Sequence, residues 1–214
     1  MSSYVRPTII GPEFRDAAGN VIPYGRRWAL GSAPEDIYSV TSNLERLRPL
    51  HAVAEALIAH LVETYEVDVS DDLVNASDIM HTRDDIVRAV RLTPRNTNAA
   101  PLTFVFTEYP SVIVHAGVLT DFLFPVCGCD ACDDAWEDVA AEMEWQILAV
   151  AAGGLSETLS RGRRPRYVSK VQADTGSIGS SGKIGPPTES TKLVRHARAR
   201  LKALTNGWVA WQLT

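Results

Sequence analysis

The feature that most constrains the fold is an apolar stripe between residues 50 and 65 that recurs with the period of an α-helix. Such a stripe buries one helix face, and most helices of this length are stable only when they pack against other elements. Pro49 suits the first helical position, where a missing N–H costs nothing, after a short turn at 42–47. The chain must therefore contain a core for this helix. The stripe consists of Leu50, Val53, Ala54, Leu57, Ile58, Leu61, Val62 and Tyr65.

Two further amphipathic helices follow from the same periodicity. One covers about residues 133–152 and ends at a Gly-Gly pair, because glycine readily adopts the left-handed conformation that closes a helix. The other covers about residues 191–204 and precedes Trp208 and Trp211, which we expect to pack on the domain. A weaker helical turn is expected at 71–80.

Short segments rich in Val, Ile, Phe and Thr predict strands at 87–93, 102–109 and 112–119. The turn residues Tyr109-Pro110-Ser111 join the last two as an antiparallel hairpin. A second hairpin is expected from 155–160 and 166–172. The order of these elements predicts an α+β fold, with a largely antiparallel sheet packed with two to three amphipathic helices.

The length of 214 residues suits a single domain spanning residues 1–214. Residues 1–40 combine Pro, Gly and scattered aromatic residues, which predicts a loop or hairpin arm. Residues 174–187 are rich in Gly and Ser, which predicts a mobile loop. No stretch approaches the roughly 20 apolar residues that span a bilayer, and the first residues lack a secretory signal. We therefore expect a cytoplasmic protein with no membrane contact.

The charge is distributed unevenly along the chain. Residues 1–160 carry a formal charge of −14, whereas residues 161–214 carry +9. One interpretation is that the basic third folds back onto the acidic part. The alternative is a surface that binds anions or nucleic acid, although no sequence-specific nucleic-acid motif is present and nucleic acid is not the favoured partner. The residues that would bind anions are Arg163, Arg164, Arg166, Arg195 and Arg198.

The only three cysteines of the chain, Cys127, Cys129 and Cys132, fall within six residues. In a chain without an export signal, such a cluster favours metal binding over a disulfide framework. Thiolates are the preferred ligands of zinc, with Zn–S distances of about 2.3 Å. The sequence therefore predicts a zinc site here. A local disulfide, such as Cys127–Cys132, and simple reduced thiols stay open as alternatives.

A structural zinc site needs four ligands, and the cysteines supply three. The candidates for the fourth are Asp130, Asp133, His115, His81 and His196. We expect Asp130 to cap the following helix, which places Cys132 at its second position. A catalytic cysteine is disfavoured, because nearby acidic residues raise the pKa of a free thiol and no base is identifiable. No catalytic residue is predicted from the sequence.

The segment Phe124-Pro125-Val126-Cys127-Gly128-Cys129-Asp130-Ala131-Cys132-Asp133-Asp134 carries a family resemblance. Together with the preceding strand 101–106 and the closing Asn206-Gly207-Trp208, it resembles an uncharacterised family of actinobacterial proteins with a domain of unknown function. The resemblance implies a cytoplasmic bacterial protein and supplies no activity, cofactor or catalytic residue.

The leading hypothesis is a non-enzymatic intracellular binding or interaction protein whose cysteine loop is held by zinc. An anion or nucleic-acid binder that uses the basic third is the second hypothesis. A metal-dependent or thiol-dependent enzyme is the third.

Overall fold

The computed structural model describes residues 3–28, 31–81, 83–162, 165–184 and 187–214, with the backbone only at 187–191. No helix in these ranges is both long and apolar enough to span a membrane. The described helices, including three short 3₁₀ turns, are η1 (Glu35–Ile37), η2 (Leu44–Leu47), α1 (Pro49–Thr64), η3 (Leu73–Asp78), α2 (Trp136–Ala151) and α3 (Pro187–Ala203).

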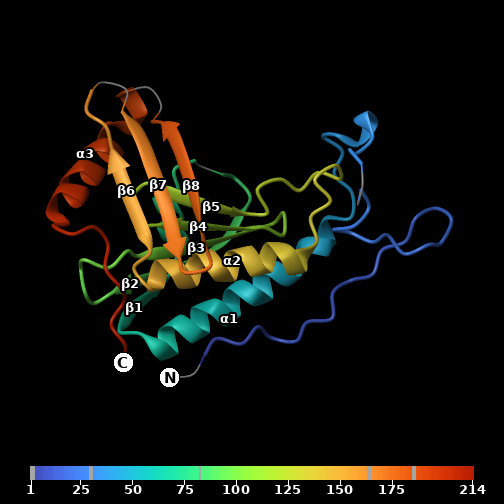
Figure 1. Ribbon diagram of the computed structural model, residues 1–214, viewed down its shortest axis with the longest axis horizontal. Helices are drawn as coiled ribbons and strands as arrows, with labels where there is room; N and C mark the ends of the chain where they lie inside the picture. The colour runs from blue at the N-terminus through green and yellow to red at the C-terminus, as the bar shows by residue number, and fades with distance from the viewer. Residues whose placement is uncertain (1–2, 29–30, 82, 163–164, 185–186) are drawn as a thin grey trace.

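Two antiparallel sheets complete the fold (Figure 1). The larger sheet has five strands in chain order, and the smaller sheet has three. Their strands are β1 (Val67–Asp71), β2 (Ile86–Pro94), β3 (Leu102–Thr107), β4 (Val112–Ala116) and β5 (Thr120–Phe124), then β6 (Leu155–Leu159), β7 (Arg166–Ala173) and β8 (Gly176–Lys183). The predicted α+β class and both predicted hairpins are confirmed.

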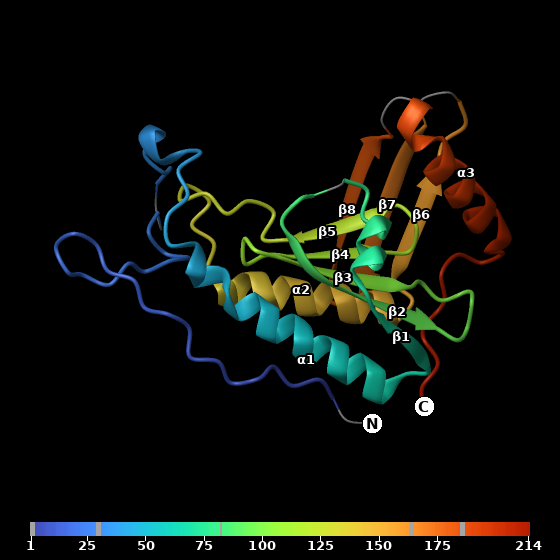
Figure 2. The same ribbon diagram turned by 180° about the vertical axis from the view of Figure 1, so that it is seen from behind.

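Helices α1 and α2 lie side by side against one face of the five-stranded sheet (Figures 1 and 2). Alternation along β3 explains this layer, because Leu102, Phe104 and Phe106 join the same core as the two helices. The intervening Val105 faces the opposite side, where it packs in a small second cluster beside η3. Pro49 begins α1 as predicted.

The smaller sheet follows directly from the end of α2. Gly153 adopts φ +84°, which ends the helix as the Gly-Gly pair predicts. Strand β7 then contacts α2, and β6 contacts α3. The C-terminal segment returns to the larger sheet, where the Trp211 Nε1–H donates to the Ala100 carbonyl over 2.9 Å. Both Trp208 and Trp211 are buried, as expected.

The prediction of a mobile loop at 174–187 was wrong for residues 176–183, because these residues form strand β8. The strand pairs with β7 in an unbroken register from Ala173–Gly176 to Arg166–Lys183. Gly and Ser contribute little side-chain packing, so composition disfavours a strand. An exposed edge strand needs only backbone pairing, and β7 supplies it.

Two other strands differ from the predictions. The strand expected at 112–119 ends at Ala116, because Gly117 adopts φ +67° and turns the chain into β5, which was not predicted. Strand β1 was not predicted, and the expected helical turn at 71–80 is the shorter 3₁₀ turn η3.

The described residues of the arm 1–40 are mostly irregular, with one isolated bridge between Arg15 and Val21. The beginning of the arm is attached to α2. The Tyr4 hydroxyl donates to the Glu144 carboxylate over 2.8 Å, and the Arg6 guanidinium forms an ion pair with the same carboxylate.

A buried carboxylate, Glu157 of β6, joins the two sheets. It accepts hydrogen bonds from the backbone N–H groups of Val118 (3.1 Å) and Leu119 (2.7 Å), which follow the Gly117 turn. The Thr120 hydroxyl (2.7 Å) and the Trp208 Nε1–H (2.9 Å) complete its shell. Burial raises the pKa of Glu157, and the four donors oppose that shift.

Replacing Glu157 with Ala leaves these buried donors without an acceptor. We expect Glu157→Ala to lower the free energy of unfolding by about 3 kcal/mol or more, measured by urea denaturation. The matched control is Thr158→Ala, an exposed position on the same strand, which should cost less than about 1 kcal/mol. Equal losses in the two variants would contradict a joining role for the carboxylate.

Candidate metal centre

The three cysteines lie in the segment that connects β5 to α2. Their Sγ atoms all lie within 4.8 Å of one another, and those of Cys129 and Cys132 are 3.5 Å apart. A turn brings them together, because the Cys132 N–H donates to the Cys129 carbonyl over 3.2 Å. Cys127 and Cys132 are exposed, and Cys129 is partly buried. The cluster therefore faces solvent.

The sulfur spacing suits a shared metal ion better than a disulfide. Tetrahedral geometry with Zn–S bonds of about 2.3 Å places neighbouring sulfurs about 3.8 Å apart. A disulfide requires about 2.05 Å, and all three cysteines are free. The thiols therefore form a preassembled set of three soft ligands.

The thiols also change one another's acidity. Hydrogen bonding from Cys127, assisted by Cys132, lowers the pKa of Cys129 to about 7. The same contacts, with Cys127 first, raise the pKa of Cys132 to about 12. One proton thus leaves the cluster readily and another is retained. A bound dication would favour loss of the retained proton as well, since its charge stabilises every thiolate.

The predicted helix start was wrong. Ala135, not Asp130, precedes the first residue of α2, so Cys132 lies in the turn before the helix. The cause is local, because Asp133 adopts a left-handed backbone conformation with φ +55° that no helix continues through. Asp130 is buried and accepts hydrogen bonds from the Ser42 hydroxyl (2.5 Å) and the Ser42 N–H (3.3 Å).

Asp133 is likewise engaged within the protein. Its carboxylate accepts the backbone N–H of Arg27 over 2.7 Å and forms an ion pair with the Arg27 guanidinium. The same guanidinium donates to the Asp130 carbonyl over 2.6 Å. These two acidic residues therefore anchor the cysteine loop to the N-terminal arm.

A buried arginine also holds the loop. Arg46 is only 3% exposed, and its guanidinium donates to the carbonyls of Ser42 (2.6 Å) and Gly128 (2.9 Å), with a longer bond to Asp134 (3.4 Å). It also lies 4.7 Å from the ring centroid of Tyr24. Arg46 thus connects the arm, η2, the cysteine loop and the approach to α2 without contacting a thiol.

Gly128 between the first two cysteines has a steric role. A Cβ at this position would overlap the Tyr109 hydroxyl, so only glycine lets the loop pass this ring. Tyr109 is partly buried, and burial raises its pKa. The phenol is therefore neutral near pH 7.

A cavity of about 310 Å³ lies beside the cluster. It is lined by Cys127 and Cys129, by Tyr109 and by Arg83, whose guanidinium forms an ion pair with Asp85 over 2.7 Å. Cys132 is not among the residues that line it. A ligand in this cavity could therefore contact Cys127 and Cys129.

None of the predicted fourth ligands belongs to the cluster among the described residues. His115 Nδ1 lies 2.6 Å from the Asp121 carboxylate, and Asp130 and Asp133 are engaged as described above. His81 and His196 are exposed elsewhere. The described residues thus offer three potential ligands, and a metal ion held by them would keep a fourth coordination position for solvent or a second molecule.

The predicted anion-binding residues are dispersed over the small sheet and α3. Arg166 lies on β7, and Arg195 and Arg198 lie on α3, all three exposed. Arg198 donates to the carbonyls of Ser160 (3.3 Å) and Gly162 (3.2 Å). Arg163 and Arg164 lie outside the described residues.

The residues that hold the loop were not predicted, and their partners explain why. Arg46 and Gly128 are 82 positions apart, and Arg27 and Asp133 are 106 apart. The one local signal is a cationic residue within the leucine-rich segment Leu44–Leu47. A charged side chain between leucines indicates that it is buried and hydrogen-bonded, although the sequence does not identify the groups that it bonds to.

A family model described as "Family of unknown function (DUF6226)" matches residues 11–214. No curated protein and no solved structure matches the chain.

Replacing Arg46 with Met keeps the apolar stem and removes every donor. We expect Arg46→Met to lower the free energy of unfolding by about 2 kcal/mol or more, because buried carbonyls lose their partner. Amide hydrogen exchange should also accelerate across 128–134.

The matched control is Arg48→Met. Arg48 is exposed and pairs with Glu45 within the same turn, so the loss should be below about 1 kcal/mol with no change in exchange. Unchanged exchange across 128–134 in Arg46→Met would show that the loop is held by other contacts.

Proposed function

Because the chain belongs to the DUF6226 family of unknown function, we propose a function from the geometry of its cysteine loop. The protein is a non-enzymatic binding or interaction protein that holds one zinc ion with Cys127, Cys129 and Cys132. The observation that carries this proposal is the convergence of three sulfur atoms within 4.8 Å. A reducing cytoplasmic location fits it, since the thiols must stay reduced to bind metal.

The surroundings support binding rather than catalysis. Three protein ligands with one open position also occur in catalytic zinc sites, where an adjacent base completes the chemistry. The described residues that line the neighbouring cavity include no carboxylate and no imidazole. Three thiolates also neutralise the charge of zinc, which weakens its activation of a bound water. The open position therefore suits a ligand atom from a partner molecule.

The exposure of the loop indicates where a partner would approach. Cys127 and Cys132 are exposed, and the preceding Val126 is 76% exposed. Hydrogen bonds from Arg46 and Arg27 to backbone carbonyls hold the loop, so it presents a fixed shape. A donor side chain on another protein would complete the tetrahedron.

Protein purified without chelator should contain one zinc per chain, determined by mass spectrometry. Cobalt substitution should give the intense absorption of tetrahedral thiolate coordination. Each single Cys→Ser variant should weaken zinc binding at least about tenfold in competition with a chromophoric chelator, because one of three protein ligands is lost.

The controls for this experiment are His81→Ala and His196→Ala, which remove exposed histidines outside the cluster. Both should bind zinc with unchanged affinity. Absence of stoichiometric metal, or equal affinity in the Cys→Ser variants, would refute the proposal.

A second observation favours anion binding as another candidate function. All ion pairs between described side chains lie between residues 6 and 144, so no described basic residue beyond 160 forms an ion pair with a described carboxylate. The hypothesis that these charges fold back onto acidic partners gains no support from ion-pair contacts.

Two of these cations, Lys192 and Arg200, line a cavity of about 730 Å³ between α3 and the outer face of the larger sheet. Helix α3 contributes Lys192, His196 and Arg200. The guanidinium of Arg200 lies 4.8 Å from the ring centroid of Trp208. The carboxylate in the lining, Asp78, is already paired with Arg91. We propose that an oxyanion such as phosphate binds here.

The double variant Lys192→Ala/Arg200→Gln should weaken binding of inorganic phosphate at least about tenfold in calorimetry, because two lining cations are lost. The matched control is Arg195→Gln/Lys202→Ala, which removes the same charge from α3 outside the cavity. Equal weakening in both variants would indicate a diffuse charge effect and contradict the cavity as the site.

A further inference from the structure

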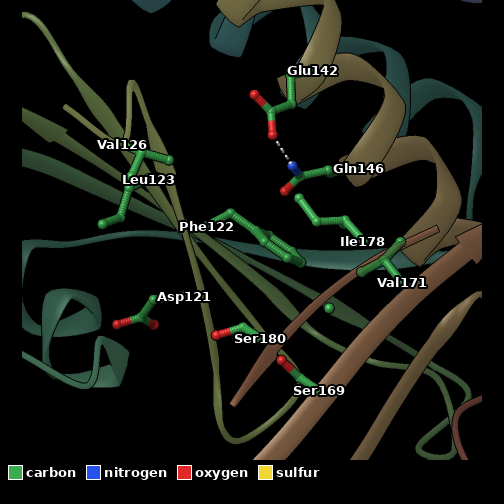
Figure 3. Close-up of a pocket in the computed structure, with 11 residues that line it drawn as sticks. Asp121, Phe122, Leu123, Val126, Glu142, Gln146, Ser169, Val171, Ile178 and Ser180 are labelled. Carbon is green, nitrogen blue, oxygen red and sulfur yellow. Dashed lines mark hydrogen bonds between the residues drawn. The ribbon is translucent and has the colours of Figure 1, made fainter. Parts of the chain in front are cut away.

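A separate cavity of about 220 Å³ lies between α2, strand β5 and the small sheet (Figure 3). Its walls are mainly apolar. Phe122 and Leu123 come from β5, Val126 follows them, and Val171 and Ile178 come from β7 and β8. The cavity therefore joins elements of both sheets and does not use the three thiols.

A buried acceptor without a partner lies in this cavity. Gln146 of α2 is 3% exposed, and its Oε1 is the one buried side-chain oxygen or nitrogen without a hydrogen bond among the described residues. Figure 3 shows this oxygen on the side of Ile178 and Phe122. Buried polar groups are nearly always paired, so an unpaired one in a cavity indicates a missing donor.

The orientation of the Gln146 amide is determined by its neighbour one helical turn away. Its Nε2 donates to the Glu142 carboxylate over 2.8 Å. An ionised carboxylate only accepts hydrogen bonds, so the nitrogen must face Glu142 and the oxygen must face the cavity. The free group is therefore an acceptor, and the ligand must donate.

The charge around the cavity selects among donors. Its described lining contains Glu142 and Asp121 and no Lys, Arg or His. Asp121 already accepts the Met80 N–H over 2.8 Å and lies 2.6 Å from His115 Nδ1. The carboxylate of Glu142 is exposed and, within the described part of the chain, accepts only from Gln146. A cationic donor matches this pair of acceptors.

The volume limits the size of the apolar part. An engineered cavity of about 150 Å³ in another protein binds benzene. A cavity of about 220 Å³ thus accommodates one six-membered ring with a short side chain.

We propose that this cavity binds a small organic ammonium ion. Its apolar body packs against Phe122 and Ile178, and its N–H groups donate to Gln146 Oε1 and to the Glu142 carboxylate. The site is independent of the zinc proposal, and either one stands if the other fails.

The probe is 2-phenylethylammonium, titrated into the full chain and followed by NMR. We expect saturable binding at one site, with signals of Phe122 and Ile178 shifted. The neutral 2-phenylethanol and the anionic 3-phenylpropionate, which share the ring, should bind at least about tenfold more weakly. Equal affinity for the alcohol would overturn the cationic assignment, and no saturation by the ammonium ion up to about 10 mM would overturn the site.

Two variants test the acceptors. Gln146→Met keeps the volume and removes the unpaired oxygen, so the melting temperature should stay equal or rise while affinity falls at least about fivefold. Glu142→Gln should lower affinity by a similar factor. The matched control is Glu137→Gln, the same substitution at an exposed position of α2 outside the cavity, which should leave affinity within about twofold. Equal weakening in the control would overturn the assignment of Glu142.

Discussion

The arrangement of the candidate zinc site depends on one buried guanidinium. A charge at the position of Arg46 is costly to bury unless its donors are satisfied, and backbone carbonyls satisfy them here. Those carbonyls belong to segments that are far apart in the chain, so the arginine is stable only when η2 and the cysteine loop are in place together. The cysteine loop and the arginine therefore depend on each other. The loop takes its shape from the arginine, and the arginine finds its partners only in that shape.

Glu157 is a buried anion that likewise holds distant segments together, here the two sheets and the C-terminal segment. Its four donors come from the Gly117 turn, from β5 and from the C-terminal segment. A carboxylate on the small sheet thereby connects the larger sheet to Trp208. Both buried ions are held mainly by hydrogen bonds to neutral groups, although Arg46 also lies 4.0 Å from the Asp130 carboxylate. Such bonds are directional, so they set position more strictly than apolar packing does.

The sequence predicted elements well where periodicity reflects burial. The stripes of α1 and α2 each bury one face, so their patterns are visible without the structure. Strand β8 has no such face, because seven of its eight residues are exposed and its stability comes from pairing with β7. The cysteines were recognisable because thiols in close succession have few other uses. Arg46, Arg27 and Tyr109 act through contacts with distant segments, and no local pattern marks such contacts.

The cavity beside Gln146 and the cavity beside Arg200 differ in the charge of the residues that line them. Helix α3 contributes Lys192 and Arg200 to one cavity, whereas Glu142 of α2 and Asp121 of β5 line the other. An anion and a cation would each find a complementary field in its own cavity and an opposing one in the other. Since Glu157 determines how the small sheet meets the larger one, the same buried carboxylate sets the geometry of both cavities.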